Sequence, residues 1–150
     1  MQISENGTRF IEQWEQYEPR PYRDQAGNWT WGYGHKQLPG EPLPSFVSQR
    51  QAIALLDKDL AWAEQAINYH VIAPLEQYQF DALCSFVFNV GVGGFYSSTL
   101  LLVLNAEDYA GVPAQMMRWV YVDENGQMVV SAGLRNRRLS EARLFARGIY

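Results

Sequence analysis

Hydrophobic positions recur along this chain with two periods, one in a short N-terminal stretch and the other through the remainder. Between Tyr22 and His35, aromatic residues alternate with small or polar ones, which predicts a hairpin or small sheet. Elsewhere, apolar residues recur every three or four positions, which predicts helices at about residues 48–69, 75–90, 98–104, 113–120 and 134–146. The pattern therefore predicts an α+β fold, with a short antiparallel sheet followed by a mainly helical segment.

Local signals indicate where several of these elements begin. Ser4 is a suitable N-cap for a first, short helix. Ser48 with Gln51 has the pattern of a capping box and opens the longest helix. An Asn-Gly pair predicts a turn or short hairpin within residues 123–131. These signals agree with the hydrophobic periods on both sides of them.

The strand predicted from Trp29 to His35 has two unlike faces. Alternation places its aromatic rings on one face, and Thr30, Gly32 and Gly34 on the other. The second face is nearly bare backbone beside one hydroxyl, where a polymer can lie against the main chain. The preceding segment, residues 24–28, has the composition of a turn.

The length of 150 residues suits one compact domain. Within it we expect a small α+β lobe over residues 1–46, a connecting helix over residues 47–70 and a helical lobe over residues 71–150. With 47% hydrophobic and 14% aromatic residues, the chain can bury a sizeable core, which excludes intrinsic disorder. No apolar run approaches the roughly 20 residues that cross a bilayer, so we expect neither a membrane anchor nor a signal peptide.

Charge and cysteine content narrow the function classes further. The formal net charge is −4, without a basic tract, which argues against nucleic-acid binding. Cys84 is the one cysteine and is expected to be a buried thiol. His35 and His70 are not in ligand spacing with other donors, so we expect no metal and no cofactor. Four late arginines form either a solvated helix face or a cationic patch near an anionic substrate: Arg135, Arg137, Arg138 and Arg143.

Three residues near the N-terminus have side chains suited to hydrolysis. Glu15 lies near the end of the first helix among apolar neighbours, a setting that suits a general acid. Asp24 begins a turn and Thr30 lies within a strand, so each also has a purely local explanation. Two carboxyls in different environments, with room for a water, are what glycoside hydrolysis requires.

The order and spacing of these residues resemble a known catalytic signature. Glu15, Asp24 and Thr30 follow one another as E-x8-D-x5-T, directly before the run Trp-Gly-Tyr-Gly-His of residues 31–35. This run looks like the signature of the phage-type lysozymes, glycoside hydrolase family 24, of the lambdoid and T-even type. Other segments also resemble the family, namely residues 48–68, 79–91, 97–100 and 133–141.

The resemblance implies a lysozyme-like fold and an endolysin that hydrolyses the β-1,4 bond between N-acetylmuramic acid and N-acetylglucosamine in bacterial peptidoglycan, with inversion. It makes Glu15 the general acid, lets Asp24 position or activate the attacking water, and lets Thr30 help to hold that water. Inversion predicts about 6.5–9.5 Å between the two carboxyl groups. The candidate substrate-binding residues are Gly32, Gly34, Phe88, Asn89 and Arg137.

The family also pairs a histidine at the position of His35 with an acid on the long helix, so the resemblance predicts an ion pair with Asp59 between the lobes. The chain departs from the family at Gln16, where glycine is usual; a left-handed conformation there would cost about 1–2 kcal/mol. It departs again at Lys36, where a small hydroxyl residue is common and a cation can point at the substrate. Many family members are basic, and this chain is acidic.

The resemblance, together with the expected lack of an anchor, predicts a monomer that stays in the host cytoplasm until lysis. It would reach the peptidoglycan of the periplasm through holin-type membrane permeabilisation. Two alternatives stay open: a bacterial muramidase toxin delivered by a secretion system, and a non-catalytic muramidase-like module that binds peptidoglycan or acts as a scaffold. Such modules tend to lose the Asp or Thr position, so the presence of Asp24 and Thr30 favours an enzyme.

Overall fold

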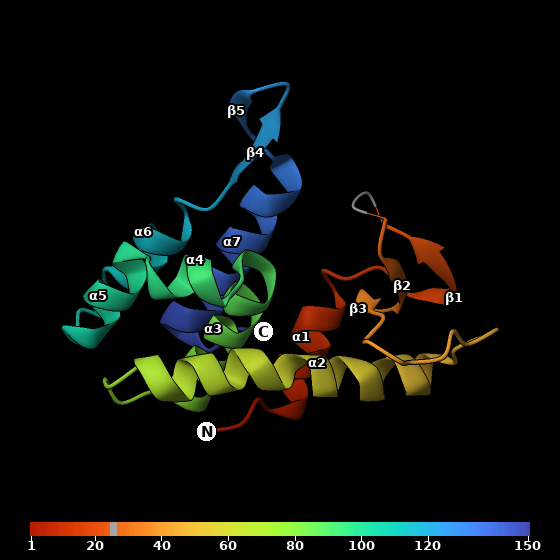
Figure 1. Cartoon of the computed structure of the whole chain (residues 1–150). Helices are drawn as coiled ribbons and strands as arrows, with labels where there is room; N and C mark the ends of the chain where they lie inside the picture. Colours follow the sequence, from red (N-terminus) through yellow and green to blue (C-terminus); the bar gives the residue numbers. More distant parts are fainter. Residues whose placement is uncertain (25–26) are drawn as a thin grey trace. The chain divides into compact units, whose positions relative to one another are not determined.

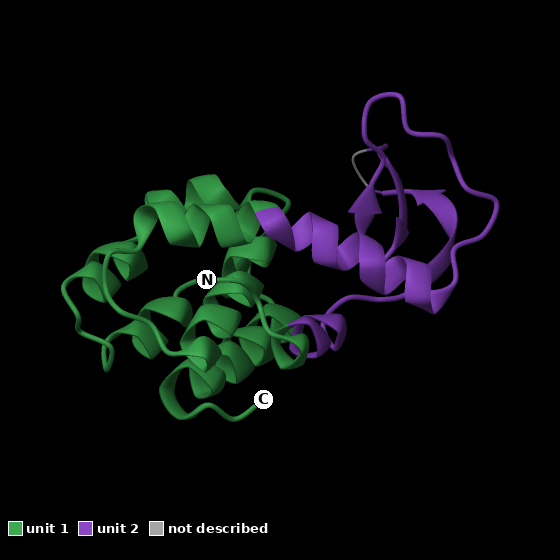
Figure 2. Ribbon diagram, turned by 90° about the horizontal axis from the view of Figure 1, so that it is seen from below, with its two compact units in different colours: residues 1–7, 62–150 green, residues 8–61 purple. Residues whose placement is uncertain are grey.

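The computed structural model describes residues 1–24 and 27–150 of the chain (Figure 1). It divides into two compact units (Figure 2). One consists of residues 8–61, and the other of residues 1–7 together with residues 62–150. The divisions fall inside the first helix, α1 (Glu5–Glu12), and inside the longest one, α2 (Gln49–His70). The sequence instead suggested boundaries at residues 46 and 70.

The unit of residues 8–61 contains a three-stranded antiparallel sheet in the order β1-β2-β3. Its strands are β1 (Glu18–Arg23), β2 (Trp29–Gly32) and β3 (His35–Lys36). The register of β1 and β2 is irregular between Glu18 and Tyr22, where two prolines cannot donate to the ladder. The small sheet predicted from the alternating pattern is confirmed.

The single strand predicted from Trp29 to His35 is wrong. β2 ends at Gly32, and Gly32 and Gly34 have φ angles of +64° and +79°, in the left-handed region that favours glycine. The chain therefore turns and returns as β3, with His35 opposite Trp31 and Lys36 opposite Thr30. Alternation along one strand does not show such a turn, because the residues on both sides of it remain aromatic or small.

The predicted capping box begins α2. Ser48 N donates to Gln51 Oε1 at 2.8 Å, and Gln51 N donates to Ser48 Oγ at 3.2 Å. The helix turns an apolar side inward, on which Ala52 is fully buried. A Cβ on Gly32 would lie 3.2 Å from Ala52 Cβ, so the glycine allows the end of β2 to approach the helix closely.

The second unit is mainly helical. Its core is centred on α3, which packs against α7. Helix α6 also packs against α7. Among the described residues, no helix combines the length and the hydrophobicity needed to cross a bilayer. The predicted hairpin and the predicted helices are confirmed, except that the helix predicted over residues 113–120 ends at Met116. The short helix α4 was not predicted. After α2, the elements of this unit are α3 (Gln77–Val90), α4 (Val92–Tyr96), α5 (Thr99–Asn105), α6 (Val112–Met116), β4 (Tyr121–Glu124), β5 (Gln127–Val130) and α7 (Ala132–Arg147).

Asp81, which is buried on α3, joins both ends of the chain to this unit. Its Oδ1 accepts from Ser4 N at 3.0 Å, and its Oδ2 accepts from the hydroxyls of Ser4 and Tyr150. Ser4 also caps α1 as predicted, because Gly7 N donates to Ser4 Oγ at 3.0 Å. A Cβ on Gly7 would lie 2.6 Å from Asp81 Cγ, so a side chain there would clash. These contacts explain why residues 1–7 belong with residues 62–150.

Candidate active site

The carboxylate of Asp24 is held where β1 passes into the connection to β2. Its Oδ1 accepts from Asn28 N at 2.8 Å, and its Oδ2 accepts from Asn28 Nδ2 at 3.3 Å. The backbone N–H of Asp24 donates to Asn28 O at 2.9 Å. The predicted turn is therefore closed at its two ends, and Gln25 and Ala26 within it lie outside the described residues.

Thr30 lies in the middle strand and is 3% exposed. Its hydroxyl donates to Asn28 O at 3.2 Å, so Asn28 contacts both Asp24 and Thr30. Tyr22 and Lys36 lie directly opposite Thr30 on the two neighbouring strands. Directly paired residues of an antiparallel sheet share a face, so these three side chains form a row across the sheet. The structure thus places Asp24 and Thr30 in contact with the same residue, Asn28.

Glu15 lies just beyond the C-terminal end of α1. Its backbone N–H donates to Glu12 O at 3.3 Å, which continues the last turn of the helix. A Cβ on Gly34 would lie 3.9 Å from Glu15 Oε2, so the missing side chain leaves space beside the carboxyl. Gly34 therefore borders Glu15, whereas Gly32 packs on α2. Gln16 is not among the residues with a positive φ, so it avoids the left-handed conformation.

The pKa of Tyr22 responds to the charges of Glu15 and Asp24, the two candidate catalytic carboxyls. Burial raises the pKa of the Tyr22 phenol above its ordinary value, and the charges of Glu18, Asp24 and Glu15 raise it further. A single hydroxyl is thus under the influence of both candidate catalytic carboxyls, and it keeps its proton at neutral pH. Sequence reasoning missed Tyr22, although its place two residues before Asp24 is visible in the sequence.

Phe88 and Asn89 lie at the C-terminal end of α3, in the other unit. The ring of Phe88 stacks on that of Trp62, with 5.7 Å between the ring centroids. Trp62 is 38% exposed, so part of this aromatic pair faces solvent. Asn89 is exposed, and its Oδ1 accepts from Arg138 Nη2, which fixes the orientation of its amide group.

Arg137 and Arg138 belong to a buried ionic cluster with Glu141. The exposed fractions of the three residues are 5%, 0% and 0%. Arg137 Nε donates to Glu141 Oε1 at 3.1 Å, and Arg138 Nη1 lies 3.2 Å from Glu141 Oε2. Burial lowers the pKa of Arg138 to about 10, so it stays a cation at neutral pH. The solvated helix face is therefore wrong for Arg137 and Arg138, and the alternative of a cationic patch near an anionic substrate stays a prediction.

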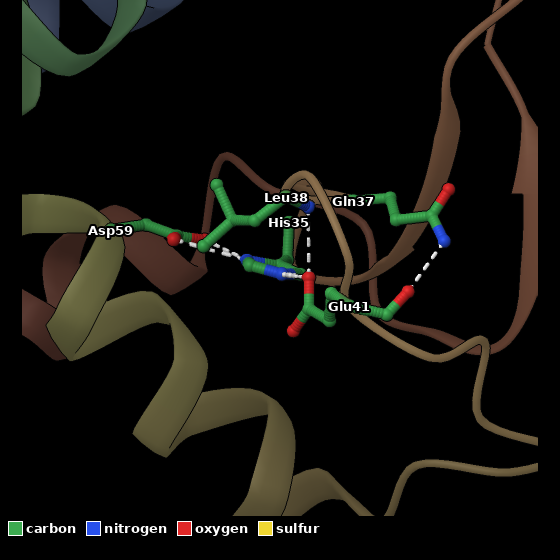
Figure 3. A network of polar contacts seen from close by, with 5 residues as sticks. All are labelled: His35, Gln37, Leu38, Glu41 and Asp59. Atoms are coloured by element: carbon green, nitrogen blue, oxygen red, sulfur yellow. Dashed lines mark hydrogen bonds and ion pairs between the residues drawn. The ribbon is translucent and has the colours of Figure 1, made fainter.

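His35, in β3, contacts α2 and the loop that follows β3 (Figure 3). Its Nδ1 lies 2.8 Å from Asp59 Oδ2, and its Nε2 lies 3.0 Å from Glu41 Oε2. The same Glu41 oxygen accepts from Leu38 N at 2.9 Å. The predicted contact with Asp59 is confirmed, but both residues belong to one unit and not to two lobes. The contact with Glu41 was not predicted, because Glu41 lies in a loop without hydrophobic periodicity.

The two carboxylates determine the charge state of His35. Burial disfavours the imidazolium, but the hydrogen bonds and charges of Glu41 and Asp59 outweigh it and raise the pKa of His35 above 6.5. A group whose pKa is raised on folding stabilises the fold below its unfolded pKa, and that stabilisation is lost as the pH rises through the folded value. The network therefore stabilises this unit most at mildly acidic pH.

We expect Asp59→Asn to lower the pKa of His35, because one of the two carboxylates that favour the imidazolium is removed. NMR titration of the imidazole measures this, with the signals of His70 as an internal reference. The loss of unfolding free energy in the variant should be largest just below pH 6.5 and should shrink as the pH rises through the His35 pKa. A His35 pKa that is unchanged in the variant would contradict the ion pair.

Cys84 is fully buried on α3, and burial raises the pKa of its thiol well above the ordinary value. It is therefore an inert thiol, as predicted. Within residues 1–24 and 27–150, no three or more His, Cys, Asp or Glu side chains are grouped so that they could hold a metal ion.

Comparisons with known proteins match nearly the whole chain. Residues 12–141 match the family model described as Phage lysozyme. The endolysin of Acyrthosiphon pisum secondary endosymbiont phage 1 is 40% identical over 97% of this chain and 98% of its own length. The solved structure of the endolysin from Escherichia coli O157:H7 phage FAHEc1 has a TM-score of 0.92 at 34% identity, covering 100% of this chain and 96% of that one. The muramidase domain of SpmX from Asticaccaulis excentricus has a TM-score of 0.90 at 36% identity, covering 96% and 97%.

Proposed function

Because this chain belongs to the phage lysozyme family, we propose that it is an endolysin that cleaves the β-1,4 bond between N-acetylmuramic acid and N-acetylglucosamine in bacterial peptidoglycan. The family makes it a glycoside hydrolase of the muramidase type. The lysozyme-like α+β fold predicted from the sequence is confirmed by its likeness to solved phage lysozymes.

One observation supports this function most directly: the segment that matches the Phage lysozyme family model, residues 12–141, contains Glu15, Asp24 and Thr30 in the order and spacing of the predicted signature. The two carboxyls have unlike surroundings. Glu15 follows a helix and has space beside it at Gly34, whereas Asp24 accepts hydrogen bonds from Asn28. Such a difference supports an acid and a water-activating group in one site.

In the proposed reaction, Glu15 gives its proton to the glycosidic oxygen as the bond to the anomeric carbon breaks. Asp24 accepts a proton from the attacking water, whose oxygen forms the new bond to that carbon. The Thr30 hydroxyl donates to Asn28 O at 3.2 Å, so its lone pairs can accept the second hydrogen of the water. One water is consumed. Glu15 has then lost one proton and Asp24 has gained one, and proton exchange with solvent returns both groups to their starting states.

The proposed setting is lysis of the bacterial host. The protein would act as a monomer, remain in the host cytoplasm until a holin-type partner permeabilises the membrane, and then reach the wall. The bacterial SpmX muramidase domain is compatible with a secreted toxin but does not favour it over the endolysin. A holin gene beside the coding sequence would support the endolysin, and a gene for an immunity protein would support the toxin.

We expect the first sugar released at the cleaved bond to have the α configuration, because a water activated by Asp24 attacks the face opposite the leaving group. Proton NMR of the anomeric region, recorded on soluble glycan strands before mutarotation, measures this. Asp24→Asn serves as the control and should slow the reaction by about a hundredfold or more. A product that keeps the β configuration would show that Asp24 does not activate water.

A further inference from the structure

Lys36 places a cation beside the candidate catalytic carboxylate. Its Nζ lies 3.6 Å from Asp24 Oδ2. From the sequence we expected this cation to point at the substrate, and the structure directs it toward Asp24. We propose that Lys36 is a positioning residue that holds the Asp24 carboxylate in the orientation that the attacking water requires. This inference rests on the function proposed above.

The turn between β2 and β3 makes the contact possible. The positive φ angles of Gly32 and Gly34 let the chain reverse direction, so that Lys36 returns directly opposite Thr30. Residues paired in this way have Cβ atoms about 4.5–5.5 Å apart on the same face of the sheet. The Cβ of Lys36 therefore lies beside that of Thr30, and the long side chain extends to Asp24, which directly follows β1.

Both oxygens of the Asp24 carboxylate have contacts in the structure. Oδ1 accepts a backbone N–H, that of Asn28, at 2.8 Å. Oδ2 is approached by two side chains, Asn28 Nδ2 at 3.3 Å and Lys36 Nζ at 3.6 Å. Side-chain contacts of this length restrain an atom less than a short backbone hydrogen bond does. Lys36 therefore adds a charged contact on the Oδ2 side of this carboxylate, beside that of Asn28.

The same ion pair contributes little to folding. The Lys36 side chain is 65% exposed and that of Asp24 is 21% exposed. Exposed pairs of this kind are screened by water and have small effects on stability. A lysine with only a structural role would be almost neutral on substitution, whereas a positioning residue alters the rate of the chemical step at unchanged stability.

The test compares Lys36→Met and Lys36→Arg with the wild type on soluble, uncrosslinked peptidoglycan strands. Lys36→Met removes the charge, and we expect kcat to fall about three- to fivefold at unchanged KM, the scale of an exposed ion pair. Lys36→Arg keeps a cation and should recover most of the rate. Lys58→Met, which changes the other lysine of the chain, is the matched control and should leave kcat unchanged. All variants should keep the wild-type Tm.

Two results would overturn the inference. One is an unchanged kcat in Lys36→Met. The other is a raised KM at unchanged kcat, which would mean that Lys36 binds anionic groups of the substrate. Strands stripped of their stem peptides by an amidase check the second: a positioning role predicts that the loss of kcat persists on them, and contact with stem-peptide carboxylates predicts that the effect disappears.

Asp24→Asn separates this inference from the proposed function. Wild-type activity in Asp24→Asn would remove the assigned role of Asp24 itself. A strong loss in Asp24→Asn beside wild-type kinetics in Lys36→Met would remove only the role of Lys36. In the Asp24→Asn background, Lys36→Met should change the residual rate by less than about twofold, because the carboxylate on which it acts is gone.

Discussion

Replacing Glu15 by Gln should slow the hydrolysis of peptidoglycan by about 10³-fold. Glutamine keeps the shape of the side chain but has no acidic proton, so the departing sugar oxygen leaves without protonation. In the structure, Glu15 lies just beyond the end of α1, and a Cβ on Gly34 would be 3.9 Å from its Oε2. Clearance of a turbid suspension of purified peptidoglycan measures the effect.

Glu12→Gln is the matched control for this variant. Glu12 is the last residue of α1, and burial raises the pKa of its carboxyl, so it is another partly desolvated glutamate close in sequence. The control should clear peptidoglycan at about the wild-type rate. Equal clearance by the wild type and Glu15→Gln would refute the assignment of the acid. No clearance by the wild type would favour the non-catalytic module.

Replacing Glu141 by Gln should lower the free energy of unfolding by about 3–5 kcal/mol, because it removes a buried charge that two buried guanidinium groups both contact. Arg137 and Arg138 both contact Glu141, and Ser85 Oγ donates to its Oε1 at 2.6 Å. In a chain of this length that loss corresponds to a Tm lower by about 10 °C. Urea unfolding and thermal melting measure the two quantities.

The same substitution at Glu124, exposed on β4, is the control. It should change the free energy of unfolding by less than about 0.5 kcal/mol. Retention of wild-type stability in Glu141→Gln would show that the buried cluster does not hold α7 on α3. Removal of one partner from a buried ion pair normally costs several kcal/mol, so this result would contradict the stabilising role of the cluster.

Local patterns predicted those features of the fold that local interactions determine. The capping box at Ser48 formed as expected, and Ser4 caps α1 through Gly7 N. The turn between β2 and β3 was missed because alternation continues through it, although the two glycines at which φ is positive were visible. The end of β2 depends on backbone conformation more than on hydrophobicity, so the hydrophobic pattern did not predict it.

Some contacts of the candidate site could be predicted from the sequence, and others could not. The pairing of His35 with Asp59 came from a family resemblance, but Glu41 could not be found, because a loop residue six positions away has no periodic signal. Lys36 was noticed as a departure from the family, yet its approach to Asp24 depends on strand register. Such contacts require the three-dimensional structure.

The burial of Arg137 and Arg138 had a signal in the sequence that charge counting overlooked. Glu141 follows them at helical spacings of four and three residues, where an acid can pair with both. Counting basic residues identified the cluster, and the position of the acid would have indicated an internal network. The spacing of opposite charges was therefore more informative than their sum.

We propose that this chain hydrolyses the bond on the reducing side of N-acetylmuramic acid, with Glu15 as the acid. The most direct test is to digest purified peptidoglycan, reduce the products with borohydride and identify the new ends by mass spectrometry. We expect N-acetylmuramitol at the new ends from the wild type, and no new ends from Glu15→Gln. New ends of N-acetylglucosaminitol, or of 1,6-anhydro-N-acetylmuramic acid, would contradict the claim.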